Sequence, residues 1–158
     1  IARLWRTVPI RAADEDDATA QLADHALLGT VPVFSVRAVN RLLDFLTRGG
    51  ELLPLRYGRA EYMAYNVTRV IDALDEKASS IARFPSGNVM SIATYVFRSD
   101  LLASVPIFKI PQLPRAHVFV TDEFVSRVAE SDLTGFRFSL LWTNGKLAMQ
   151  NDSSAPTT

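Results

Sequence analysis

The clearest periodic pattern in the chain lies in residues 35–48, where apolar side chains recur every three or four positions. This spacing predicts a helix that buries one face, because it gathers the apolar residues into one stripe. Ser35 is positioned to cap the first turn, and Gly49 or Gly50 can end the helix in a left-handed cap. We interpret this segment as a core-packing helix without a site. The expected buried stripe consists of Val36, Val39, Leu42, Leu43 and Leu46.

Runs of β-branched and aromatic residues predict strands before and after the middle of the chain. Pro54 cannot donate to a ladder and is expected at an edge or an irregular position. A second amphipathic pattern over residues 122–130 predicts a helix that starts at Asp122. The predicted strands cover residues 51–57, 61–67, 89–97, 107–110, 117–121 and 136–142, and Asn144 and Gly145 then suit a hairpin turn that leads to Met149.

These elements predict an α+β fold: a single domain in which an antiparallel or mixed sheet of about five to seven strands packs against two or more helices. The second half lacks the regular helix alternation of a doubly wound parallel sheet. We expect one domain over residues 1–149, with a short strand within residues 1–10. Residues 150–158 are polar and are expected to form a flexible C-terminal tail.

The charge balance argues against a nucleic-acid or membrane partner. Seventeen basic and seventeen acidic side chains cancel among the 158 residues, so no net field attracts polyanions. No apolar run approaches the roughly 18 residues that span a bilayer, and no signal-peptide pattern opens the chain. We therefore expect a soluble, cytoplasmic protein. The acidic run at residues 14–17 fits either a solvated loop or a mimic of nucleic-acid phosphates.

The residues that usually carry catalysis or bind metals are scarce. The chain contains no Cys, which excludes thiol nucleophiles and zinc fingers. His25, expected in a helical turn, and His117, expected at the start of a strand, have no partner at metal-ligand spacing. We predict no catalytic residue, no metal site and no cofactor.

Asp72 and Asp75 form an acidic pair with a spacing of three positions. On a helical turn their carboxylates would share one face, as in a general acid/base or metal site. They could instead cap a short helix, or form an exposed acidic face for an Arg or Lys of a partner. A catalytic use would require them, or Asp100, to converge with Arg69 or Arg98 in a cleft.

Six short segments, taken in their joint order, resemble one protein family. They are residues 35–39 (SVRAV), 50–55 (GELLPL), 66–75 (NVTRVIDALD), 107–111 (IFKIP), 118–124 (VFVTDEF) and 133–138 (LTGFRF). The family is Imm11, a group of bacterial immunity proteins, and the resemblance extends from about residue 33 to residue 142.

The resemblance implies a protein without enzymatic activity that protects a bacterium by binding a polymorphic toxin. We therefore predict a stoichiometric complex with a cognate protein toxin. Two other interpretations stay open: a small hydrolase or transferase that uses the Asp pair, and a structural or regulatory module of a longer protein. Because acids near strand ends can meet basic groups of a toxin, the expected contacts are Asp72, Asp75, Glu76, Asp100 and Glu123.

Overall fold

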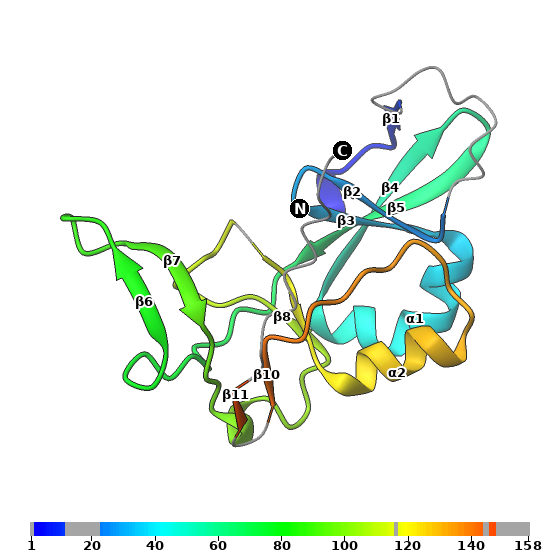
Figure 1. Ribbon diagram of the computed structural model, residues 1–158. Coiled ribbons are helices and arrows are strands. Elements are labelled where there is room, and N and C mark those ends of the chain that lie inside the picture. Colours follow the sequence, from blue (N-terminus) through cyan, green and yellow to red (C-terminus); the bar gives the residue numbers. More distant parts are fainter. Residues whose placement is uncertain (1, 12–22, 116, 144–145, 148–158) are drawn as a thin grey trace, which may run out of the picture.

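The computed structural model describes residues 2–11, 23–115, 117–143 and 146–147 (Figure 1). Its largest element is a mixed five-stranded sheet with the strand order β1-β4-β5-β3-β2. Only β1 and β4 are parallel, and the other neighbouring strands are antiparallel. Together with two packed helices, this sheet confirms the predicted α+β class. The strands are β1 (Val8–Ile10), β2 (His25–Leu28), β3 (Val31–Ser35), β4 (Gly50–Tyr57) and β5 (Ala60–Val67).

The two longest strands, β4 and β5, form an antiparallel hairpin in the middle of the sheet. Gly58 in its turn has a φ of 57°, a left-handed conformation that glycine adopts at little cost. Pro54 of β4 lies just before the register in which β1 pairs with Leu55 to Tyr57. Its outer side is therefore not covered by β1, which fits the edge position expected for a residue without an amide hydrogen.

Helix α1 (Val36–Gly49) begins as predicted, because the Ser35 side chain accepts a hydrogen bond from the Ala38 amide at 3.0 Å. The buried stripe differs from the prediction in two members: Val36 and Leu43 are 42% and 46% exposed. Ala38 and Phe45 are buried instead, so the packed face is rotated from the predicted one, and the Phe45 ring meets Phe124 edge-on. The buried residues of the helix are Ala38, Val39, Leu42, Phe45, Leu46 and Gly49.

The end of α1 does not form the predicted left-handed cap. Gly50 has a φ of −179°, which is extended backbone. The glycines are needed for close packing instead, since a Cβ on Gly49 would meet Ile107 and Tyr65, and a Cβ on Gly50 would meet the Asn66 carbonyl. The chain therefore turns directly from the helix into β4.

Helix α2 (Asp122–Glu130) packs beside α1 on the same face of the sheet (Figure 1). The helix starts at Asp122 as predicted, and Thr121 is its N-cap residue. Phe124 and Val128 are buried, and Val125 is half-buried. The resulting core contains side chains from both helices and from the sheet, together with Ile107. It contains Phe34, Ala38, Val39, Leu42, Phe45, Leu46, Tyr65, Val67, Ile107, Phe124 and Val128.

The later strands pair with one another rather than joining the main sheet. In Figure 1 the β6–β7 hairpin stands apart from the two helices. A second core, rich in stacked aromatic rings, lies beneath these pairs. The pairs are β6 (Ser80–Arg83) with β7 (Val89–Thr94), β8 (Ile107–Phe108) with β9 (Phe119–Val120), and β10 (Trp142–Thr143) with β11 (Lys146–Leu147).

The strand predicted over residues 136–142 is wrong except at Trp142. Phe136 and Phe138 stack on each other and contact Phe124 at the edges of their rings. Their alternation therefore serves packing against α2, without a partner strand. The antiparallel pairing of β10 with β11 confirms the strands of the C-terminal hairpin, whereas its turn residues Asn144 and Gly145, and Met149, lie outside the described residues.

The N-terminal region contains a 3₁₀ turn, η1 (Ala2–Leu4), followed by β1, which confirms the short strand expected there. His25 lies in strand β2 rather than in a helical turn. Its ring stacks on Phe136 with centroids 4.6 Å apart, so packing across the sheet edge overrides local helix preference. The acidic run at residues 14–17 and the tail at 150–158 lie outside the described residues.

Candidate functional site

The segment after β5, which carries three of the candidate acids, is extended and held by backbone hydrogen bonds. Isolated bridges join Val70 to Lys109 and Leu74 to Phe97. The Asp75 amide donates to the Val96 carbonyl at 2.8 Å. Leu74 is almost completely buried in the second core. The backbone under Asp72 and Asp75 is therefore fixed by long-range contacts and is extended up to Asp75, where a single turn closed by the Ser79 amide and the Asp75 carbonyl begins.

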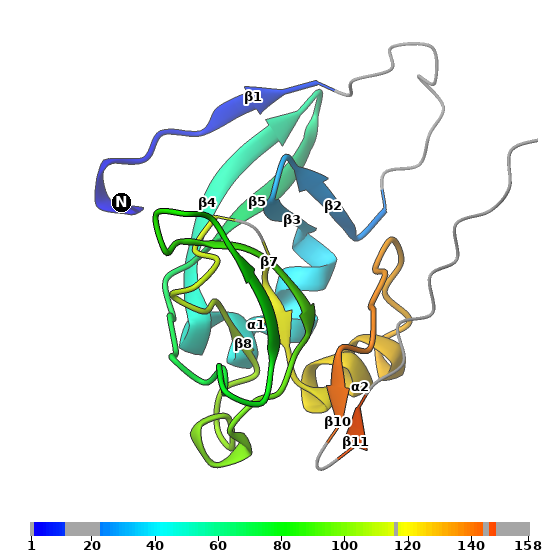
Figure 2. The same cartoon turned by 60° about the vertical axis from the view of Figure 1, so that its left-hand side comes forward.

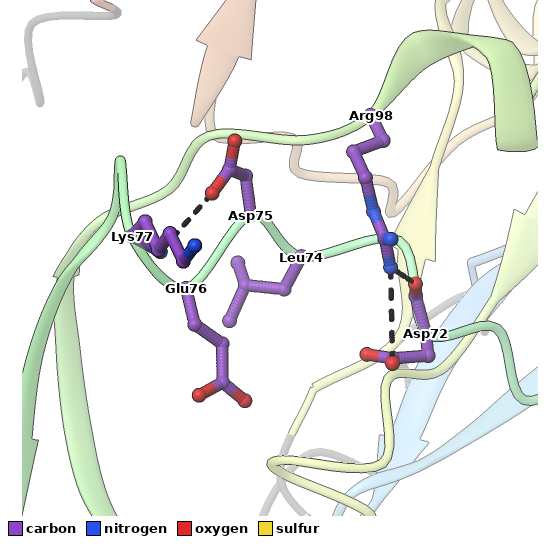
Figure 3. A pocket seen from close by; sticks show the side chains of 6 residues that line it. All are labelled: Asp72, Leu74, Asp75, Glu76, Lys77 and Arg98. Atoms are coloured by element: carbon purple, nitrogen blue, oxygen red, sulfur yellow. Dashed lines mark hydrogen bonds and ion pairs between the residues drawn. The ribbon is translucent and has the colours of Figure 1, made fainter.

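This extended backbone overturns the expected pairing of Asp72 with Asp75. Figure 3 shows the Asp75 carboxylate turned away from those of Asp72 and Glu76. It accepts hydrogen bonds from the amides of Lys77 at 3.0 Å and Ala78 at 3.2 Å, so it closes a local turn. The two Asp side chains therefore do not form a joint acid/base or metal site. Of the interpretations given above, Asp75 comes closest to a cap, because its carboxylate binds two amides at the start of a single turn.

Asp72 is instead connected to Glu76 through a residue from a distant loop. The amide nitrogen Nε2 of Gln112 donates to Asp72 Oδ1 at 2.8 Å and to Glu76 Oε1 at 2.9 Å. Arg98 lies 3.7 Å from Asp72 Oδ2 and also donates to the Asp72 carbonyl oxygen. Arg83 pairs with Glu76. A chain of polar contacts thus links both carboxylates to two arginines.

A shallow, open hollow of about 290 Å³ lies over this network (Figure 3). Its charges nearly cancel, because Lys77 and Arg98 line it together with the acids, and Arg83 neutralises Glu76. Within the described part of the chain, no group of three or more acidic or His side chains has the arrangement of a metal site. The hollow is therefore an open surface of nearly balanced charges. It is lined by Asp72, Leu74, Asp75, Glu76, Lys77 and Arg98.

The two remaining candidates lie elsewhere. Asp100 lies in the 3₁₀ turn η2 (Ser99–Leu101), and Glu123 lies in the first turn of α2. Both side chains are exposed, and neither forms a hydrogen bond or ion pair with another described residue. Neither lines the hollow. The structure therefore brings Asp72 and Glu76 together and leaves Asp100 and Glu123 as separate exposed charges.

Comparison with known protein families matches residues 58–141, more than half of the chain, to the Imm11 immunity protein family. The chain belongs to the Imm11 family. A search of curated proteins found no match. This membership confirms the resemblance to Imm11 seen in the sequence and supports an immunity protein role.

The Imm11 match includes all five candidate acids, from Asp72 to Glu123. It also spans β5, the β6–β7 hairpin and α2, but it begins after α1 and β4. The candidate site therefore lies wholly within the residues that match the Imm11 family. Among the described residues, no helix is both long and apolar enough to cross a membrane.

A buried carboxylate at the junction of β2, β3 and α1 was not predicted from the sequence. Asp24 is 7% exposed and accepts hydrogen bonds from Ser35 Oγ at 2.7 Å, Arg37 Nη1 at 2.8 Å and the Thr134 amide at 3.0 Å. Arg37 also donates to the carbonyl oxygens of Ser131 and Asp132, just after α2. Asp24 therefore fastens the helix layer to the sheet edge.

Two titratable groups at this junction have shifted pKa values. Burial raises the pKa of Asp24, but hydrogen bonds from Ser35 and Thr134 and the charge of Arg37 outweigh burial, so the pKa lies below its ordinary value. Burial lowers the pKa of His25, and its contact with the Gly135 carbonyl opposes this shift only in part. Both shifts arise from structural contacts far from the hollow.

Proposed function

We propose that this protein binds a cognate bacterial toxin and neutralises it as a stoichiometric protein complex in the cytoplasm. Membership of the Imm11 family carries the proposal. An inhibitor of this kind needs a stable interface, typically of about 1,600 Å² with a few well-packed anchors. It needs no catalytic step and no cofactor.

The proposed toxin contact includes the acids around the hollow. Asp72 and its partner Arg98 have side chains that are 66% and 46% exposed. An exposed pair of this kind contributes little to stability, so a basic side chain of the toxin can replace Arg98 at low cost. Asp100 and Glu123 add charges that no described residue neutralises. Asp75 supports the shape of the site through its turn.

The proposal is tested with the toxin-bearing reading frame next to this protein's gene. Co-expression with the toxin should restore growth, and calorimetry of the purified proteins should show saturable binding with a fixed stoichiometry. Growth arrest despite soluble expression, together with absence of binding, would overturn the proposal. Turnover of a nucleotide, peptide or glycan library that disappears in Asp75→Asn would favour the enzymatic alternative instead.

The placement of the contact is tested by charge reversal at Asp100 and Glu76. Asp100→Lys should weaken toxin binding at least several-fold with little change in Tm, because Asp100 has no partner to lose in the described structure. Glu76→Lys should weaken binding and also lower Tm slightly, since it breaks the contacts to Arg83 and Gln112. Glu130→Lys, at the far end of α2, is the matched control. Unchanged affinity in both test variants would place the interface elsewhere.

A further inference from the structure

The outer edge of the five-stranded sheet carries several arginines, which lie on β4, in the β4–β5 turn and in the segments before and after β1. Figure 2 shows the N-terminal segment running along the outer side of β4. The parallel register pairs Pro9 with Arg56 and Ile10 with Tyr57, which places the next residue, Arg11, beside the β4–β5 turn. The Trp5 indole donates to the Pro54 carbonyl at 2.9 Å and holds the start of the segment against β4. We name this border the arginine edge: Arg3, Arg6, Arg11, Arg56 and Arg59.

The charge of the arginine edge is not balanced within the described structure. All five side chains are exposed, and none forms an ion pair with a described residue. The ion pairs that the structure shows involve other arginines. Residues 2–11 and 50–61 contain five Arg but only two acids, Glu51 and Glu61, an excess of three positive charges. Around the hollow, in contrast, Asp72 is paired with Arg98 and Glu76 with Arg83.

The side chains of the arginine edge, rather than its backbone, are suited to recognition. Pro9 lies in the middle of β1 and has no amide hydrogen, which hinders the addition of a further strand. Guanidinium groups bind carboxylates through two parallel hydrogen bonds. The exposed apolar residues between the arginines are aliphatic: Leu4 is 91% and Val8 40% exposed. The aromatic residues Trp5 and Tyr57 are half-buried, and the Trp5 indole is bound to the Pro54 carbonyl. Aliphatic side chains fit a protein surface, whereas single-stranded nucleic acids stack on aromatic rings.

We infer that the arginine edge is a second contact surface for the toxin and binds acidic side chains on it. The inference rests on the proposed function, and it assigns to this contact a charge opposite to that of the candidate acids. Unpaired surface charges act mainly on the rate of association, because they attract an oppositely charged partner before the surfaces meet. The arginine edge is thus expected to govern how fast the complex forms.

The test compares two triple variants that remove the same charge. The edge variant is Arg3→Gln, Arg6→Gln and Arg56→Gln. The control variant is Arg41→Gln, Arg115→Gln and Arg137→Gln, three exposed arginines away from the edge that pair with no described acid. Stopped-flow association with the toxin should slow about tenfold for the edge variant at 50 mM salt and less than about threefold at 500 mM, because salt screens exposed charges. The control should change less than about twofold.

Equal slowing in both variants would assign the effect to net charge alone and overturn the inference. So would unchanged toxin association with a selective loss of binding to a single-stranded RNA oligomer. The acids at residues 14–17 offer an internal partner: an equal drop in Tm on neutralising either these acids or the edge would also overturn it. If the unaltered protein does not bind the toxin, the proposed function fails and the inference with it, whereas unchanged association of the edge variant overturns the inference alone.

Discussion

Two Asp–Arg pairs in this protein have the same chemistry and opposite surroundings. Asp24 lies 2.8 Å from Arg37, and its side chain is 9% exposed. Asp72 lies 3.7 Å from Arg98, and its side chain is 66% exposed. Asp24 gains further hydrogen bonds from Ser35 and Thr134. Burial and the number of fixed donors therefore separate a carboxylate that stabilises the fold from one that is available to a partner.

The two pairs differ in their contribution to stability because water can replace the partner of an exposed charge but not the partner of a buried one. An exposed ion pair is worth at most about 1 kcal/mol, because water solvates both charges when it breaks. Loss of one partner of a buried carboxylate leaves polar groups unsatisfied, and this costs several kcal/mol. The junction of β2, β3 and α1 should therefore tolerate little change, and the hollow should tolerate much.

The largest expected effect is that of Asp24→Asn. The variant keeps the side-chain shape but removes the charge that binds Arg37, and it turns an amide towards existing donors. We expect a loss of about 2–4 kcal/mol in the free energy of unfolding, measured by urea denaturation. Asp44→Asn, which breaks the more exposed pair with Arg127, is the control and should cost about 0.5 kcal/mol. Similar losses of unfolding free energy in both variants would show that the buried and the exposed Asp–Arg pairs do not differ in their contribution to stability.

A second test uses pH, and its sign follows from the pKa shifts. The pKa of Asp24 is lowered from 3.8 on folding, so its stabilisation is present above that value and is lost as the pH falls through the folded pKa. The pKa of His25 is lowered from 6.5, so the unfolded chain takes up a proton first and stability declines below pH 6.5. Asp24→Asn should flatten the acidic limb of a Tm–pH profile. A profile unchanged by Asp24→Asn would contradict the assigned role.

Tyr65→Phe gives an intermediate case, because it removes a neutral buried hydrogen bond. The Tyr65 hydroxyl donates to the Leu46 carbonyl at 2.8 Å and ties the end of α1 to β5. We expect a loss of about 1–1.5 kcal/mol by urea denaturation, less than for Asp24→Asn. A larger loss for Tyr65→Phe would show that anchoring the helix end matters more than the buried charge.

The parts of this fold that depend on neighbours in sequence could be predicted. The Ser35 cap and the strands at 51–57 and 61–67 rest on residues within a few positions of each other, and the structure confirms both. The strand prediction for residues 136–142 was wrong. Alternating apolar residues indicate an extended chain with one packed side, but they do not show whether a second strand pairs with it. The rings of this segment pack on α2 instead.

The candidate site shows the same limit. The sequence singled out Asp72 and Asp75, but their spacing could not show whether the backbone was helical or extended. Bridges to Lys109 and Phe97, more than twenty positions away, decided it. Asp24 escaped notice because its partners Ser35 and Thr134 lie 11 and 110 positions along the chain. Gln112, which links Asp72 to Glu76, is 36 to 40 positions from them.

The smallest expected effect is the coupling between Asp72 and Arg98. A double-mutant cycle with Asp72→Asn and Arg98→Gln should give a coupling of at most about 0.5 kcal/mol in unfolding free energy, because both side chains are exposed. The matching cycle with Asp24→Asn and Arg37→Gln should give more than about 1.5 kcal/mol, because Asp24 is buried. For toxin binding the order should reverse, with the Asp72 cycle carrying the larger coupling, since only that carboxylate is accessible to a partner. A large stability coupling at Asp72 would mean that the hollow is held together by its own charges, and the proposed exchange of Arg98 for a toxin side chain would then be too costly.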